Sequence, residues 1–200
     1  MNKSPEFETR IKYNSEEKQR VADLLDGQIS LYAGSVFLTA LDIYSQFELL
    51  QSTRIILLND FDRFVGGVNK DGQPVIVLAN NHEIVTPGLK SRILKRFVLP
   101  SNLKNAPTGF FKLFIFAHEL GHVVQADPQF QSVFGEIDNN VYSPEEDYVR
   151  YVESDHEVNA NYIAATIIAE SVVGKTARYN RPDKPPMQWK DWANEHRVVG

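Results

Sequence analysis

The residues best suited to chemistry in this chain lie in the stretch FAHELGHVVQ, residues 116–125. His118 and His122 stand four positions apart, and Glu119 directly follows the first histidine. On an α-helix, a four-residue step returns to within about 40° of the same direction, so both imidazoles can reach one ion. Glu119 points about 100° away from His118, which places its carboxylate beside that ion. The spacing predicts a metal site with a free base next to it.

The pattern His-Glu-x-x-His is typical of zincins, in which the histidines bind Zn²⁺ and the glutamate is the general base. Zinc lowers the pKa of its water to about 7, and the glutamate passes the proton of that water to the leaving amine. The alternative is an inert, hydrogen-bonded trio on a buried helix, but desolvating three polar side chains without a partner is costly. Gly121 weakens the helix by about 1 kcal/mol, which makes sense if another backbone or a ligand passes close by.

A catalytic zinc site has three protein ligands and one open position. The chain has no cysteine, so the third ligand is sought among the acids and histidine of VESDHEVNAN, residues 152–161. Glu157 is favoured, because Asn161 one turn later could hydrogen-bond the free ring nitrogen of a ligand histidine. Glu153, one turn before Glu157, stays open as the alternative ligand. His156 either lines the cleft as a catalytic residue that hydrogen-bonds the oxyanion, or is an exposed polar residue.

Two motifs together resemble the ImmA/IrrE family of small bacterial and phage zinc peptidases. In that family a HELGH helix precedes a helix that carries Glu-x-x-Ala-Asn, and here FFKLFIFAHELGH is followed by EVNANYIAATIIAE. The resemblance implies that His118, His122 and Glu157 are the zinc ligands and that Glu119 is the base. Asn161 would support a ligand, in the position where the broader gluzincin clan carries an acid.

The resemblance also implies a fold and an activity. The expected fold class is α+β, a zincin-like domain with the HExxH helix under a small, mostly antiparallel sheet and with N-terminal helices. An edge strand of that sheet would take the substrate by strand addition, and PVIVLA, residues 74–79, is the predicted edge. The expected activity is that of a zinc endopeptidase that acts on a specific protein or peptide. Members of the ImmA/IrrE family cleave repressors or act beside a transcription factor, so the resemblance implies a transcriptional regulator as one such partner. The alternative is a catalytically silent zincin-fold regulator or effector that binds a partner protein.

The rest of the chain predicts the elements around this site. The NKDG sequence at residues 69–72 is the signature of a tight hairpin turn. One domain is expected over 1–200, with extended arms at 1–13 and 176–200. Amphipathic or apolar periodicity predicts helices over 15–29, 36–50, 109–126 and from 157 to about 173, with a short helix within 90–112. Strands are predicted at 53–59, 63–69 and 73–80.

Composition limits the classes of function. The 200 residues are 42% hydrophobic, which is enough for one core, and the net charge of −5 argues against direct binding of nucleic acids or of anionic membranes. No stretch reaches the roughly 18 apolar residues of a membrane span, and no apolar leader begins the chain, so a cytoplasmic location is expected. Residues 90–112 carry six basic residues and no acid, a stretch that could dock an acidic partner or be a solvated face.

Overall fold

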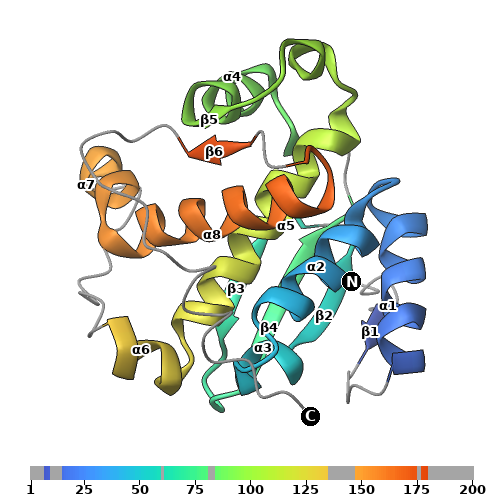
Figure 1. The fold of residues 1–200 in the computed structure, drawn as a ribbon, viewed down its shortest axis with the longest axis vertical. Helices are drawn as coiled ribbons and strands as arrows, with labels where there is room; N and C mark the ends of the chain where they lie inside the picture. Colours follow the sequence, from blue (N-terminus) through green and yellow to red (C-terminus); the bar gives the residue numbers. More distant parts are fainter. Residues whose placement is uncertain are drawn as a thin grey trace, which may run out of the picture.

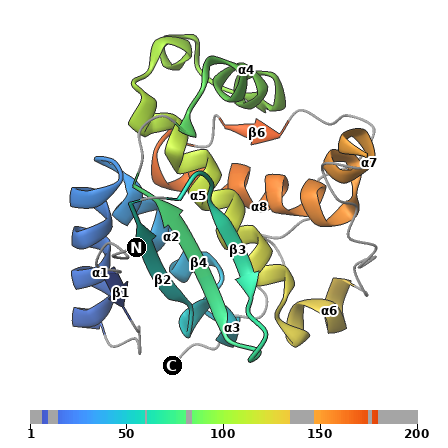
Figure 2. The same cartoon turned by 180° about the vertical axis from the view of Figure 1, so that it is seen from behind.

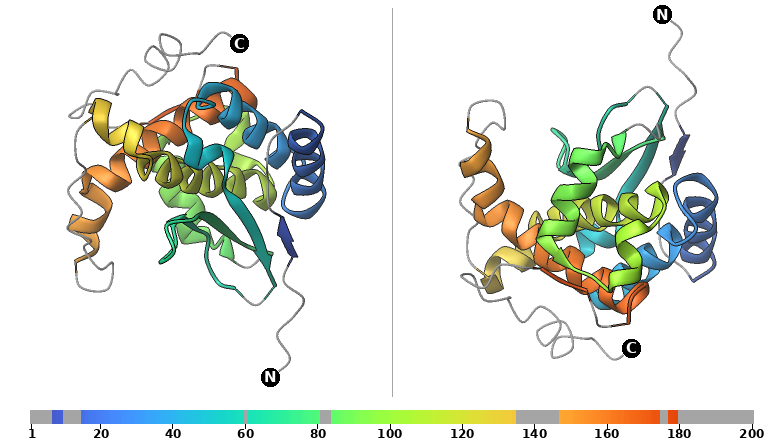
Figure 3. Two further views of the ribbon diagram at one scale, coloured as in Figure 1. Left: turned by 90° about the horizontal axis from the view of Figure 1, so that it is seen from below. Right: turned by 90° about the horizontal axis from the view of Figure 1, so that it is seen from above.

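A buried helix, α5 (Thr108–Gln125), runs through the middle of the protein and carries the HELGH motif (Figure 1). In the computed structural model, the main sheet covers one side of α5, and α2 (Ala33–Ile43) and α8 (Asp155–Ser171) cover the other (Figure 3). Of the 18 residues of α5, 14 are buried, which confirms the apolar helix predicted at 109–126. The structure describes residues 7–9, 15–59, 61–80, 84–134, 147–174 and 177–179.

The first predicted helix is confirmed, whereas the second is divided. Helix α1 begins at Ser15, as expected. The region 36–50 holds the end of α2 and a short α3, because a turn between them buries Tyr44 and Phe47, whose stacked ring centroids are 6.0 Å apart. The other helices are α1 (Ser15–Gln28), α3 (Glu48–Gln51), α4 (Pro87–Arg96), the 3₁₀-helix η2 (Ser101–Asn105), α6 (Pro128–Phe134) and α7 (Tyr148–Glu153).

The main sheet has four strands in the order β1-β2-β4-β3. They are β1 (Phe7–Thr9), β2 (Arg54–Leu58), β3 (Val65–Val68) and β4 (Pro74–Ala79). The outer pairings, β1 with β2 and β3 with β4, are antiparallel, whereas the central pairing of β2 with β4 is parallel. The fold is therefore α+β with a small mixed sheet, and the three strands predicted between residues 53 and 80 are confirmed.

The predicted edge strand is wrong. PVIVLA forms β4, which lies between β2 and β3, and the edge beside α5 is β3 instead (Figure 2). The physical reason is the difference in apolar content between the two strands. Strand β4 is mostly buried and uses both of its edges, whereas β3 has the sequence VGGV and is partly exposed. The more apolar strand takes the inner position.

The hairpin turn predicted between β3 and β4 is confirmed. Gly72 has a φ of 73°, a left-handed conformation that glycine adopts without strain. The Asn69 side-chain oxygen accepts hydrogen bonds from the backbone amides of Asp71 and Gln73, at 3.0 and 2.9 Å. The turn reverses the chain direction, so that β4 pairs antiparallel with β3.

The buried apolar residues form one core cluster. The arms predicted at 1–13 and 176–200 lie mostly outside the described residues, although residues 7–9 form β1. A second, two-stranded sheet joins β5 (Phe97–Val98) to β6 (Arg178–Tyr179). Among the described residues, no helix combines the length and the apolar character needed to cross a bilayer.

Helices α5 and α8 approach each other most closely at Gly121. A Cβ added to Gly121 would lie 2.9 Å from the Ala160 Cα and 3.0 Å from the Ala160 carbonyl oxygen. Any larger residue would therefore push the two helices apart. The sequence-based expectation that another backbone passes close to Gly121 is confirmed.

We expect Gly121→Ala to lower the free energy of unfolding by about 1–3 kcal/mol, because overpacking against a backbone outweighs the gain in helix propensity. Gly27→Ala is the matched control, since Gly27 also lies in a helix but has no atom within 4 Å of the added Cβ. It should be neutral or stabilise by up to about 1 kcal/mol. Urea denaturation of the two variants measures the difference, and equal stabilities would contradict the close approach.

Candidate metal centre

Three side chains from α5 and α8 meet at one point and form the metal-ligand cluster, His118, His122 and Glu157. The Nε2 atoms of the two histidines are 2.9 Å apart. The Glu157 carboxylate oxygens lie 3.3 Å from His118 Nε2 and 3.4 Å from His122 Nε2. Among the described residues, this is the group whose donor atoms could hold a metal ion.

The spacing of these donors fits a tetrahedral metal ion. Ligands about 2.0–2.1 Å from a tetrahedral zinc lie about 3.3–3.4 Å from one another. The two distances between nitrogen and oxygen match this value, and the distance between the nitrogens is a few tenths of an ångström shorter. The cluster can therefore close around an ion with only a small adjustment.

Hydrogen bonds alone satisfy the cluster less well. If both rings donate to Glu157, the two Nε2 atoms face each other at 2.9 Å with no proton between them. If one ring donates to the other, one of the contacts with Glu157 loses its hydrogen. A cation accepts a lone pair from all three groups, which is the arrangement that buried polar side chains require.

The electrostatics of the cluster keep Glu157 ionised. Burial by itself would raise the pKa of Glu157, but hydrogen bonds from both histidines, together with their charges, hold it well below its usual range. Burial and the charge of His118 lower the pKa of His122 to about 3. Burial also lowers the pKa of His118, but the hydrogen bond and negative charge of Glu157 and the charge of Glu119 outweigh burial and raise it. An ionised carboxylate and a neutral imidazole are the forms that bind metals.

Glu119 lies beside the metal-ligand cluster but is not one of its members. The Gly66 backbone hydrogen-bonds its carboxylate, and a Cβ at Gly66 would collide with the Glu119 backbone, so β3 lies directly against the motif. Burial raises the pKa of Glu119 to about 7, with the charge of His118 lowering it and that of Glu157 raising it further. A carboxyl group with this pKa can both accept and release a proton near neutral pH.

The structure separates the two acids that the sequence left as alternatives. Glu153 ends α7, and Ser154, with an extended backbone, caps α8 by accepting a hydrogen bond from the Glu157 amide at 3.4 Å. The two acids therefore lie on different helices, and the one-turn relation assumed for them does not exist. Glu157 belongs to the metal-ligand cluster and Glu153 does not.

The expectation for Asn161 is wrong. Its side-chain amide donates to the Glu157 backbone carbonyl at 2.9 Å, one turn back on the same helix, and His122 Nδ1 has no partner among the described residues. Asn161 thus braces the α8 backbone beneath the ligand instead of orienting a histidine. The His156 ring stacks on His122, with centroids 4.2 Å apart, so it lies next to the metal-ligand cluster. Its role towards an oxyanion stays a prediction.

Two further residues support the site through contacts that the sequence did not assign to them. The Gln125 side chain donates to the His156 carbonyl at 3.0 Å and so ties the end of α5 to the start of α8. The Tyr151 hydroxyl on α7 hydrogen-bonds the Glu157 carboxylate, and burial followed by the charge of Glu157 raises its pKa. Gln125 stands one turn after Gly121, a spacing that could have identified it. For Tyr151 the sequence offers several tyrosines and no signal that selects this one.

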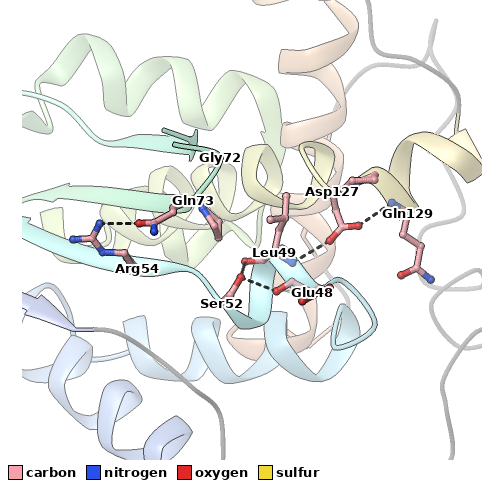
Figure 4. Close-up of a pocket in the computed structure, with 10 residues that line it drawn as sticks. Glu48, Leu49, Ser52, Arg54, Gly72, Gln73, Asp127 and Gln129 are labelled. Carbon is pink, nitrogen blue, oxygen red and sulfur yellow. Dashed lines mark hydrogen bonds between the residues drawn. The ribbon is translucent and has the colours of Figure 1, made fainter. Parts of the chain in front are cut away.

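A separate pocket of about 710 Å³ lies between α3, the hairpin of β3 and β4, and the start of α6, and contains no member of the metal-ligand cluster (Figure 4). Its buried acid, Asp127, accepts hydrogen bonds from the amides of Leu49 and Gln129, at 3.0 and 2.8 Å. Asp127 therefore caps α6 and ties it to α3. Among the described residues, the metal-ligand cluster is the only group of three or more histidines and acids close enough to share an ion, so this pocket is not assigned as a second metal site.

The purified wild-type protein should bind one zinc ion per chain, and His122→Ala should not hold stoichiometric zinc. Glu157→Gln and Glu153→Gln form a matched pair, because each replaces one glutamate by glutamine and the two positions are only four residues apart. The first should lose zinc and the second should retain it. Elemental analysis after dialysis measures the content, and zinc should stabilise the wild type by about 4 kcal/mol at a thousandfold excess over Kd. Equal zinc contents in the pair would contradict the ligand assignment.

Comparison with known proteins gives no relative. No family model matches the chain, and neither a curated protein nor a solved structure matches it. The resemblance to the ImmA/IrrE peptidases rests on the two sequence motifs.

Proposed function

We propose that the protein is a zinc-dependent endopeptidase with a zincin-like site, as the resemblance to the ImmA/IrrE family implies. The observation that carries the proposal is the separation of roles at the site. Three groups converge at distances that suit a tetrahedral ion, and a fourth, Glu119, lies beside them with a pKa raised to about 7. A purely structural metal site is normally closed by four protein ligands and needs no free base.

Zinc is the metal that the donors and the HExxH motif together favour. Two imidazoles and one carboxylate form the ligand set of several zinc hydrolases and also of non-haem iron sites, and the HExxH motif is typical of zinc. Magnesium and calcium take oxygen ligands almost exclusively. When bound, the ion supplies a Lewis acid that lowers the pKa of water to about 7 and polarises a carbonyl group. The described residues supply three donors, so an ion bound there would have a position available for water.

The protein residues then move the protons. Glu119 takes a proton from the attacking water and passes it to the nitrogen of the leaving amine, which breaks the peptide bond. The Gly66 backbone orients the carboxylate during both transfers. The Tyr151 hydroxyl and the His156 ring flank the metal-ligand cluster, at positions from which each could donate to the oxygen of the carbonyl under attack.

Strand β3 is the proposed platform for the substrate. No described strand pairs with its outer edge, and Val65 and Val68 are 42% and 41% exposed. A peptide that pairs with this edge would pass over Glu119, because Gly66 lies between these two valines and contacts that glutamate. Strand addition of this kind requires an extended substrate segment, which suits cleavage within a protein chain.

Glu119→Gln should retain zinc and the fold but reduce peptide cleavage by a factor on the order of 10² to 10⁴, because only the base is lost. The measurement is the appearance of new amino termini when a proteome-derived peptide library is incubated with the zinc-loaded protein. A chelator-treated sample is the second control. Cleavage by the variant at the wild-type rate would show that Glu119 is not the base. The absence of any zinc-dependent cleavage would favour a protein that binds partners without hydrolysis.

A further inference from the structure

The basic helix α4 contributes one face to the surroundings of the metal-ligand cluster. Arg92 donates to the Tyr148 hydroxyl at 2.8 Å, and its guanidinium lies 5.8 Å from the centre of that ring. Tyr148 begins α7, the helix whose Tyr151 hydrogen-bonds the ligand Glu157. Arg96 lies one turn after Arg92, so both side chains leave α4 on the same face. This face of α4 is therefore turned towards α7 and the site.

The end of α4 that carries Arg96 packs against α5 just before the HELGH motif. The next residue, Phe97, packs on Phe114 of α5 with ring centroids 5.0 Å apart, and Phe114 is one turn before His118. The charge of Arg96 is also felt within the site. The charge of Arg96 lowers the pKa of His118, but its effect is smaller than those of burial, which also lowers this pKa, and of Glu157 and Glu119, which raise it. The same charge lowers the pKa of Tyr151, where burial and the charge of Glu157 raise the pKa by more.

Within the described part of the chain, Arg96 has no ion-pair or hydrogen-bond partner, although it is half-buried. The described acids of the site and of the junction between α7 and α8 are engaged elsewhere. Glu119 and Glu157 belong to the site, and Asp147 pairs with Arg150 at 3.2 Å. The two remaining acids at the junction of α7 and α8, Glu153 and Asp155, also have partners. A half-buried guanidinium beside a reaction centre thus has its donors available for a ligand.

The simplest other role for Arg96 is to offset the partial negative charge at the end of α4. Lys95 also lies in the last turn of α4, is exposed, and can do the same. A role at the helix end would make Lys95 and Arg96 equivalent, whereas a role in the site would involve Arg96 alone. The two residues therefore form a natural matched pair.

We propose that Arg96 binds an acidic side chain of the substrate next to the bond that is cleaved, so that the substrates are peptides with Asp or Glu at that position. The inference rests on the proposed endopeptidase function and names its substrate class. A guanidinium forms two parallel, charge-assisted hydrogen bonds with a carboxylate. The side chain of Asn or Gln has the same shape as that of Asp or Glu but no charge and only one acceptor oxygen, so it cannot form this pair. The preference therefore depends on the negative charge of the substrate as well as on its size.

The test compares peptides that carry Asp or Glu with otherwise identical peptides that carry Asn or Gln. A zinc-loaded wild type should cleave the acidic peptides on the order of tenfold faster in kcat/KM, which corresponds to about 1.4 kcal/mol. Arg96→Gln should abolish that ratio. Lys95→Gln, which removes the same charge from the same helical turn, should preserve it. A wild type that cleaves both sets equally, or a ratio that falls equally in the two variants, would overturn the assignment.

A binding measurement keeps this inference separate from the proposed function. Zinc-loaded Glu119→Gln, alone and combined with Arg96→Gln or Lys95→Gln, is titrated with the same fluorescent peptides by anisotropy. If the wild type cleaves nothing, the endopeptidase proposal fails. The acidic preference is then still supported by tighter binding of acidic peptides that is lost only with Arg96→Gln. Equal or undetectable binding of the two peptide sets would count against Arg96 as a substrate-binding residue.

Discussion

The close approach of α5 and α8 at Gly121 and Ala160 brings Glu157 to the two histidines of the metal-ligand cluster. Because Gly121 has no Cβ to hold the helices apart, Glu157, one turn before Ala160, comes within 3.3–3.4 Å of both histidines. A carboxylate side chain is too short to bridge a wider gap between helices. The buried contact between α5 and α8 thus holds the cluster on two rigid elements, which is a condition for positioning ligands accurately.

A second glycine performs the corresponding task on the other side of α5. Gly66 lets β3 lie against the Glu119 backbone while its own backbone hydrogen-bonds the Glu119 carboxylate. The site is therefore layered, with α8 supplying a ligand from one side of α5 and β3 fixing the base from the other. Strand β3 is also an edge of the sheet, so no described strand pairs with the outer edge of the strand that hydrogen-bonds Glu119.

The local part of this arrangement could be predicted from the sequence, and the tertiary part could not. His118, His122 and Glu119 follow from helical spacing alone, since four-residue and one-residue steps have fixed directions on a helix. The choice between Glu153 and Glu157 depended on the end of one helix and the start of the next at Ser154. A single serine that can cap a helix does not by itself predict such a break. The edge position of β3 follows from the pairing of β4 with β2. The hydrogen bond from Asn161 to the Glu157 carbonyl depends on how the Asn161 side chain is oriented. Neither property has a periodic signature.

The two carboxylates at the centre show how environment shifts the pKa of the same chemical group in opposite directions. Glu157 accepts hydrogen bonds from two histidines, which overcome the cost of burial and keep the pKa far below its usual range. Glu119 is also buried, but it has one backbone hydrogen bond and a second negative charge nearby, so its pKa rises to about 7. A permanently ionised carboxylate suits a metal ligand, and one that titrates near neutrality suits proton transfer. The opposite shifts of these two pKa values agree with the geometry, which places Glu157 within 3.3–3.4 Å of both histidines and leaves Glu119 outside the metal-ligand cluster.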